Sequence, residues 1–159
     1  MKKTDLAYVA GIIDGEGWIS IKNRQIKNGN RNYALKVGLG NTNEWLVNWL
    51  KFSFGGSVCV KKKWLVNQKQ QWVWDLSTKQ ASEFLKMILP YLKIKKPQAE
   101  LAIKFQSRRK YRGNPNWKIK GKRRMTDAEV ALDEADKILM GSYNKRGIDN
   151  VIQKETRSN

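Results

Sequence analysis

Small residues recur every four positions near the start of the chain, and apolar residues then alternate with polar ones. The recurrence lies in Thr4–Gly17, where Thr4 is a suitable N-cap and Asp5 follows in the first turn, so a helix is predicted there. Strict alternation over Trp18–Arg24 and again over Tyr33–Asn41 predicts two strands. The short glycine-containing link between these strands indicates a hairpin.

The same order of elements follows a second time. Thr42 or Asn43 can cap a short helix that Gly55-Gly56 ends. Two further strands are predicted over Ser57–Lys63 and Gln70–Ser77. Trp72, Trp74 and Leu76 share one face of the last strand; the two tryptophans could stack on bases, but a place in the core is favoured.

Helical periodicity dominates the rest of the chain. The predicted elements are a helix from Lys79 to Pro90, a helix over Ala99–Phe105, a basic polar loop over Ser107–Arg124 and a helix from Thr126, with its capping box, to about Asn144. The order α-ββ-α-ββ-α predicts one α+β domain with a four-stranded antiparallel sheet and helices packed on one face. We expect this domain to span residues 1–147 and residues 148–159 to form a C-terminal tail.

Charge narrows the class of partner. The formal net charge is +18, and residues 1–125 hold 27 of the 32 basic residues but only 7 of the 14 acidic ones. A folded domain with this net charge attracts polyanions, foremost nucleic acid. The same charge is also found in proteins whose basic surface only serves solubility and in ribosomal-type binders.

The absence of histidine limits the chemistry. Without it the chain cannot form a Ser-His-Asp triad or a Cys-His pair, and the lone Cys59 excludes an internal disulfide and the common zinc sites. No apolar run is long enough to span a membrane and no signal-peptide pattern is seen, so an intracellular protein is expected, in a prokaryotic cytoplasm or an organelle. Carboxylates, lysines and bound ions remain for any reaction.

One carboxylate at the end of the first predicted helix is unusual. Glu16 lies where the helix dipole disfavours an anion, with Asp14 two positions before it. A divalent cation would remove that penalty; alternatively, this is a solvated helix end where Asp14 bonds nearby amides. Ala7, Gly11 and Gly15 form a stripe of minimal side chains, which favours close approach by another helix.

These residues form a recognisable motif. Val9-Ala10-Gly11-Ile12-Ile13-Asp14-Gly15-Glu16-Gly17 resembles the nine-residue motif that names the LAGLIDADG homing endonucleases. Its flanks, Leu6-Ala7-Tyr8 and Trp18-Ile19, and the later segment Pro90-Tyr91-Leu92-Lys93-Ile94-Lys95 are also similar to that family, and the order of elements matches it.

The resemblance implies a function: site-specific, metal-dependent cleavage of double-stranded DNA at a long pseudo-palindromic target, as in intron homing. It implies that Glu16 and the Gly15 carbonyl bind Mg²⁺ (or Mn²⁺, with Ca²⁺ as a non-catalytic substitute) and that Asn41 orients water or metal. Lys95 would offset transition-state charge, although it could instead only contact phosphates. No nucleotide cofactor and no membrane are implied.

The resemblance also implies a homodimer, because the chain holds one motif and a duplex has two strands. The stripe of Ala7, Gly11 and Gly15 would form the contact between the paired motif helices. The outward face of the sheet would bind DNA through bases or, alternatively, through phosphates alone; its predicted residues are Ser20, Lys22, Arg24, Lys36, Gly38, Lys61, Lys63 and Gln71. The alternatives are a LAGLIDADG-type maturase that binds intron RNA and a non-catalytic nucleic-acid-binding protein.

Overall fold

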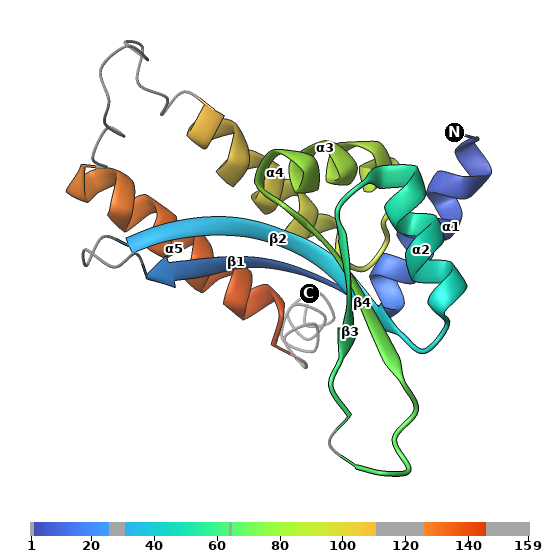
Figure 1. Cartoon of the computed structure of the whole chain (residues 1–159). Coiled ribbons are helices and arrows are strands. Elements are labelled where there is room, and N and C mark those ends of the chain that lie inside the picture. Colours follow the sequence, from blue (N-terminus) through green and yellow to red (C-terminus); the bar gives the residue numbers. More distant parts are fainter. Residues whose placement is uncertain (1, 26–30, 64, 111–125, 146–159) are drawn as a thin grey trace, which may run out of the picture.

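The four strands form one antiparallel sheet in the computed structural model of the chain (Figure 1). The strands are β1 (Gly17–Gln25), β2 (Arg31–Asn41), β3 (Ser57–Lys61) and β4 (Gln71–Ser77), and their order across the sheet is β1-β2-β4-β3. The structure describes residues 2–25, 31–63, 65–110 and 126–145. The predicted α+β architecture is confirmed; the tail predicted for 148–159 lies outside the described residues.

Helices cover the sheet and extend beyond it at both ends. They are α1 (Lys3–Glu16), α2 (Glu44–Phe54), α3 (Thr78–Ile88), α4 (Lys96–Lys110) and α5 (Asp127–Tyr143), with a short 3₁₀ turn, η1 (Leu89–Tyr91), between α3 and α4. In Figure 1, α1 and α2 gather at one end of the molecule and α5 lies toward the other. None of the described helices is long and apolar enough to cross a lipid bilayer.

The core lies between the sheet and these helices. Five apolar residues of the alternating pattern in β1 and β2 are buried; they are Ile19, Ile21, Leu35, Val37 and Leu39. Trp74 of β4 is fully buried against Phe54 and Phe84, and its indole Nε1 donates a hydrogen bond to the Gly55 carbonyl over 2.8 Å. The predicted core role of Trp74 is therefore confirmed, whereas Trp72 is only half-buried.

Several predicted boundaries were wrong by a few residues, among them the start of the first helix and the end of β3. The first helix begins at Lys3 and not after an N-cap at Thr4, because the carboxylate of Asp5 reaches back to accept a hydrogen bond from the backbone N–H of Lys2 over 3.2 Å. Strand β3 ends at Lys61, so Lys63 lies in the turn that follows the strand.

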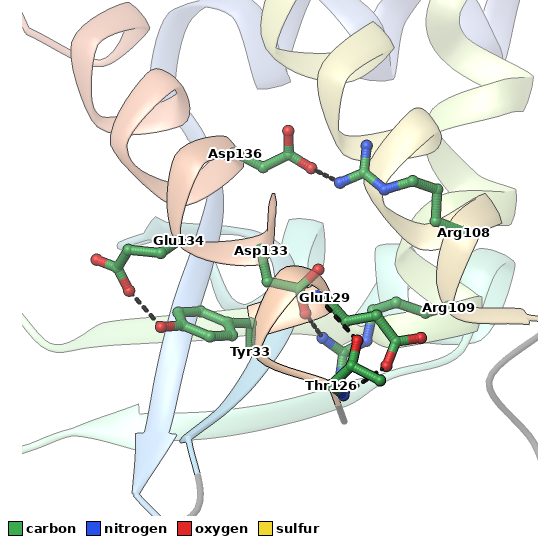
Figure 2. Close-up of polar contacts among 8 residues, drawn as sticks. All are labelled: Tyr33, Arg108, Arg109, Thr126, Glu129, Asp133, Glu134 and Asp136. Atoms are coloured by element: carbon green, nitrogen blue, oxygen red, sulfur yellow. Dashed lines mark hydrogen bonds and ion pairs between the residues drawn. The ribbon is translucent and has the colours of Figure 1, made fainter. Parts of the chain in front are cut away.

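The start of the predicted basic loop is helical instead. Helix α4 continues to Lys110, since Arg108 and Arg109 form ion pairs with Asp136 and Asp133 of α5 (Figure 2). The pair between Arg109 Nη1 and Asp133 Oδ2 spans 2.6 Å, and Asp133 is fully buried. The remainder of that loop, residues 111–124, lies outside the described residues.

Helix α5 is anchored at its start, middle and end. The predicted capping box is present: the Glu129 N–H donates to Thr126 Oγ1 over 3.3 Å, and the Thr126 N–H donates to Glu129 Oε2 over 2.9 Å (Figure 2). Tyr33 of β2 donates a hydrogen bond to Glu134. At the far end, Asn144 donates its side-chain amide to the carbonyl of Ile19 over 2.9 Å, which joins the helix end to strand β1.

Candidate active site

Helix α1 buries one face and exposes another. Val9, Ala10 and Ile13 are fully buried against the core, because they lie on the side of the helix that faces the sheet and α3. Gly11 and Gly15 are exposed, and a Cβ atom added at either would meet nothing within 4 Å. The small residues are therefore not explained by any packing within the described part of the chain.

An open groove runs along this exposed face. It has a volume of about 550 Å³, and its lining includes Ala7, Gly11, Gly15, Glu16 and Asn41. Glu16 is the last residue of α1 and is exposed, so its carboxylate stands at the end of the groove where the helix dipole is negative. The groove thus connects the small-residue stripe to the predicted metal ligand.

The side chain of Glu16 is held in place from strand β2. Asn41, the last residue of that strand, donates its Nδ2 amide hydrogen to Glu16 Oε2 over 2.7 Å. Its Oδ1 atom accepts the backbone N–H of Asn43 over 2.8 Å, which fixes the orientation of the amide. Asn43 is the N-cap of α2, with its side chain accepting the Leu46 N–H over 3.2 Å. The start of α2 therefore orients Asn41 toward the carboxylate.

The role of Asn43 was not predicted beyond helix capping. Of the two residues considered as caps, Asn43 is the one that serves, and the same residue also positions Asn41 through its backbone. The alternation of strand and helix signals places Asn41 and Asn43 next to one another, but it carries no information on the rotamer of Asn41. The hydrogen bond from the Asn43 N–H to Asn41 Oδ1 could therefore not be predicted from the sequence.

Lys95 reaches the end of α1 from the turn before α4. Its Nζ donates hydrogen bonds to the carbonyl of Ile13 over 2.9 Å and to the carbonyl of Asp14. A cation at this position interacts favourably with the negative end of the helix, and it bonds the Ile13 carbonyl in addition to the Gly17 N–H that already donates to it. The Lys95 side chain therefore lies at the C-terminal end of α1, although Lys95 is 79 positions from Glu16 in the sequence.

Burial changes the ionisation of Lys95. Loss of hydration lowers the pKa of its ammonium group from the usual value of 10.5, and the nearby negative charge of Asp14 acts in the opposite direction. An ammonium group has three N–H donors, of which two are bonded to carbonyls among the described residues. The third N–H is not used in either of these two bonds.

Asp14 joins α1 to that same turn. Its Oδ2 accepts the backbone N–H of Lys93 over 2.7 Å, and its Oδ1 accepts the backbone N–H of Lys95 over 2.8 Å. Asp14 is buried, with 9% of its surface exposed. The alternative in which this residue bonds only nearby amides is therefore wrong, because both donors lie about eighty positions away in the sequence. Asp14 positions the segment that carries Lys95.

Few of the described residues at this site could be ligands of a metal ion. The described residues contain no group of three or more acidic, cysteine or histidine side chains able to hold a metal ion by themselves. Glu16 and the carbonyl of Gly15 supply oxygen, and Mg²⁺ commonly binds one or two carboxylates together with water and substrate phosphate. These two oxygen atoms could therefore hold a hard cation whose remaining ligands are not protein side chains of the described residues.

The outer face of the sheet carries the predicted DNA-binding residues. Lys22 and Lys61 are exposed, Ser20, Lys36 and Gln71 are half-buried, and Gln71 stands opposite Lys61 in the register. The side chain of Arg24 is outside the described part, although its backbone pairs within β1. These positions alternate with the buried ones, so they share one face.

Two predicted residues differ in setting from the rest. Gly38 is buried, because the ring of Trp18 lies across it: a Cβ at position 38 would meet Trp18 Cζ2 at 2.6 Å and the Trp74 carbonyl oxygen at 2.4 Å. Gly38 therefore supports Trp18 and is not itself open to a ligand in this structure. Lys63 is exposed but lies beyond the end of its strand. An acidic residue on this face, Asp75, was not predicted.

Comparison with known proteins supports the fold. No protein-family model matches the chain, and no curated protein matches it significantly. Among solved structures, the chain is similar to the archaeal intron-encoded homing endonuclease I-Vdi141I complexed with DNA, with a TM-score of 0.70, 13% identity, and coverage of 92% of this chain and 88% of that one. It is also similar to the homing endonuclease I-CvuI in complex with its target in the presence of calcium, with a TM-score of 0.68, 16% identity, and coverage of 91% and 85%.

The chain is also similar to part of a longer protein. The LAGLIDADG meganuclease I-CpaMI, bound to uncleaved DNA, has a TM-score of 0.53 and 16% identity, with coverage of 66% of this chain and 38% of that one. At identities this low, the likeness establishes a shared fold.

Proposed function

Since the chain has the fold of the LAGLIDADG homing endonucleases, we propose that it is a site-specific endonuclease that cuts double-stranded DNA. The observation that carries the proposal is the exposed carboxylate of Glu16, which Asn41 holds at the end of α1. An anion at this end of a helix is disfavoured by about 0.3–1 kcal/mol, so a structural role is a poor explanation for it. A cation-binding role accounts for both its position and its exposure.

We propose that two copies of the chain form the enzyme. Cleavage of a duplex requires two strand cuts, and the described residues offer one such carboxylate. The open groove along Ala7, Gly11 and Gly15 can receive the same face of a second α1, in an isologous contact where one patch meets its twin. This packing brings both copies of Glu16 close to the two-fold axis. It also implies a target of two related half-sites.

The residues around Glu16 would each contribute to hydrolysis. Mg²⁺ bound by Glu16 and the Gly15 carbonyl would supply a water of lowered pKa and positive charge beside the scissile phosphate. Asn41 keeps the carboxylate in one orientation, since its own amide is fixed by Asn43. Lys95 presents its remaining N–H to the developing negative charge, and it is already held in place by two carbonyls before substrate binds.

The substitution Glu16→Gln tests the proposal. A target is first selected from a pool of random duplexes by the wild-type protein in Ca²⁺, and cleavage of that target is then measured in Mg²⁺. Glutamine preserves the shape and the Asn41 contact but removes the ligand charge, so cleavage should be lost while binding in Ca²⁺ remains. Glu83→Gln is the matched control, because it makes the same change of charge on α3, where Glu83 pairs with Lys86.

Other results would contradict the proposal. A Glu16→Gln protein that cuts at the wild-type rate would remove the metal-site assignment. A wild-type protein that binds structured RNA but selects no duplex would support the maturase alternative. A wild-type protein that selects a duplex and never cuts it in Mg²⁺ or Mn²⁺ would be a non-catalytic binder.

A further inference from the structure

A single acidic residue occupies the sheet. The four strands contain five basic residues, namely Lys22, Arg24, Arg31, Lys36 and Lys61, and Asp75 is their one acid. It lies on the outer face, because it stands opposite Gly38 of β2 and Ser57 of β3, two positions from Val73 on that face. On a surface that binds a polyanion, a carboxylate opposes binding through its charge. Its presence there needs a specific reason.

Asp75 forms an ion pair and a hydrogen bond, and it lines a hollow in the outer face of the sheet. Its Oδ2 forms a short ion pair with Lys36 Nζ, and its Oδ1 accepts a hydrogen bond from Ser57 Oγ over 3.0 Å. The two charged side chains are 21% and 26% exposed, so each is partly shielded yet reachable from outside. Both line a hollow of about 180 Å³ in the outer face, together with Trp18, Lys22 and Val73.

The Trp18 ring that lines this hollow is held in place by packing. Trp18 lies across Gly38, and no side chain at that position could be accommodated without displacing the ring or the β4 backbone. The indole therefore forms one wall beside Lys36 and Asp75. A lysine and an aspartate on flexible stems are in this way held next to each other at a defined place on the sheet.

The pair matches the chemistry of one base pair. In the major groove, guanine presents two acceptors, N7 and O6, and the paired cytosine presents the N4 amino group as a donor. A lysine ammonium donates to the guanine acceptors and an aspartate accepts from cytosine N4. An A·T pair instead presents a donor at adenine N6 and an acceptor at thymine O4, the reverse of what a lysine opposite the purine and an aspartate opposite the pyrimidine can bond.

We propose that Lys36 and Asp75 together read one G·C base pair in each half-site of the target, an inference that rests on the proposed DNA endonuclease function. In the free protein the two side chains neutralise each other, and on binding each exchanges part of that contact for a base edge. Asp75 contributes specificity at the expense of general affinity. Lys36 contributes to both, because its charge also attracts the phosphate backbone.

The experiment compares base preferences and not activity. Wild-type protein, Asp75→Asn, Asp75→Ala and Lys36→Gln each select duplexes from the same random pool in Ca²⁺, and affinities are then measured for all single-base variants of the wild-type target. Glu83→Gln serves as the control for a change of one charge unit away from the sheet. Circular dichroism establishes that each variant is folded.

The expected result is confined to one position per half-site. Asp75→Ala and Lys36→Gln should lose discrimination at the same G·C pair by about 5- to 150-fold, the range for one good base contact. Asp75→Asn should turn the preference there toward A·T, since an amide can bond adenine N6 and N7. Glu83→Gln should leave the whole profile unchanged.

Three results would overturn the inference. Asp75 variants that bind every sequence more tightly with an unaltered profile would show a carboxylate that only repels phosphate. Variants of Lys36 and Asp75 that relax different positions would separate the two residues. Either of these leaves the proposed function intact, because the wild-type target is still selected; a wild-type protein that enriches no duplex at all would remove the function and this inference together.

Discussion

Replacing Gly11 with leucine should stabilise the isolated chain and destroy the proposed dimer. Glycine inside a helix costs about 0.8–1 kcal/mol relative to alanine, and leucine is nearly as favourable as alanine. Because an added Cβ at Gly11 meets nothing within 4 Å, the single chain should gain about 0.5–1 kcal/mol of stability. Across a two-fold contact, two leucines enter the interface. At about 1–3 kcal/mol of overpacking each, the dimer should weaken by about 2–6 kcal/mol, or roughly 30-fold to 10⁴-fold.

The structure offers a matched control for this change. Gly141 also lies inside a helix, α5, is exposed, and has nothing within 4 Å of an added Cβ. Gly141→Leu should therefore give the same gain in helix stability with no effect on association. Sedimentation velocity over a range of concentrations measures the dimer, and urea unfolding at concentrations below its dissociation constant measures the single chain, since association would otherwise add to the apparent stability.

Three outcomes would contradict the proposed interface or its consequences. A Gly11→Leu protein that sediments as the wild type does and still cuts both strands would show that the groove is not the interface. A variant that is less stable as a single chain would show that the groove is filled by a part of the protein itself. A wild-type protein that is monomeric at micromolar concentration and cuts both strands would refute the dimer altogether.

Three further predictions concern binding, positioning and ionisation. Neutralising Lys61 and Lys63 as glutamines should lower the log–log salt slope of DNA binding by about 0.9 for each lost phosphate contact, and an unchanged slope would remove this strand end from the interface. Asp14→Ala should cost about 1–3 kcal/mol in urea unfolding, because it leaves the backbone N–H groups of Lys93 and Lys95 without their acceptor; a loss below 0.5 kcal/mol, as estimated from the usual worth of a replaceable bond, would show that water substitutes for it. Burial lowers the pKa of Lys95 in the folded protein. Between that pKa and the unfolded value of 10.5 the unfolded chain therefore binds more protons, so the free energy of unfolding rises with pH. Lys95→Met should remove this rise in unfolding measured from pH 8 to 10.5, and a pH slope equal to that of the wild type would contradict the assignment.

The fold was predictable because apolar and polar residues alternate regularly in its strands. Ile19 and Ile21 alternate with Ser20 and Lys22 at strand spacing, and the structure places the first two in the core and the others on the outer face. A period of two specifies which side of a sheet each residue occupies, whatever its neighbours. Glu16 was equally visible, because a carboxylate at a helix C-terminus departs from the helix dipole rule.

Contacts between distant segments were less accessible to such reasoning. Asp14 looked like a second charge near Glu16, whereas it is a buried acceptor for amides in the turn before α4. Asp75 was overlooked because one acid in a polar position of a strand has no periodic signature, and its meaning arises only from Lys36 and Trp18 beside it. Helix α4 exceeded its predicted length since its last turn depends on ion pairs with α5, which no local propensity encodes.

The bonds from Asp14 to Lys93 and Lys95 also determine when the site can exist. They connect positions 79 and 81 residues apart. A chain made at about 5–20 residues per second therefore carries Asp14 and Glu16 for roughly 4–16 s before Lys95 has been added. During that interval α1 can form, but the turn that brings the lysine to its C-terminal end is missing. The proposed site is thus completed only after residue 95 has been made, and a nascent chain that already displays the acidic end of α1 still lacks the lysine contacts there.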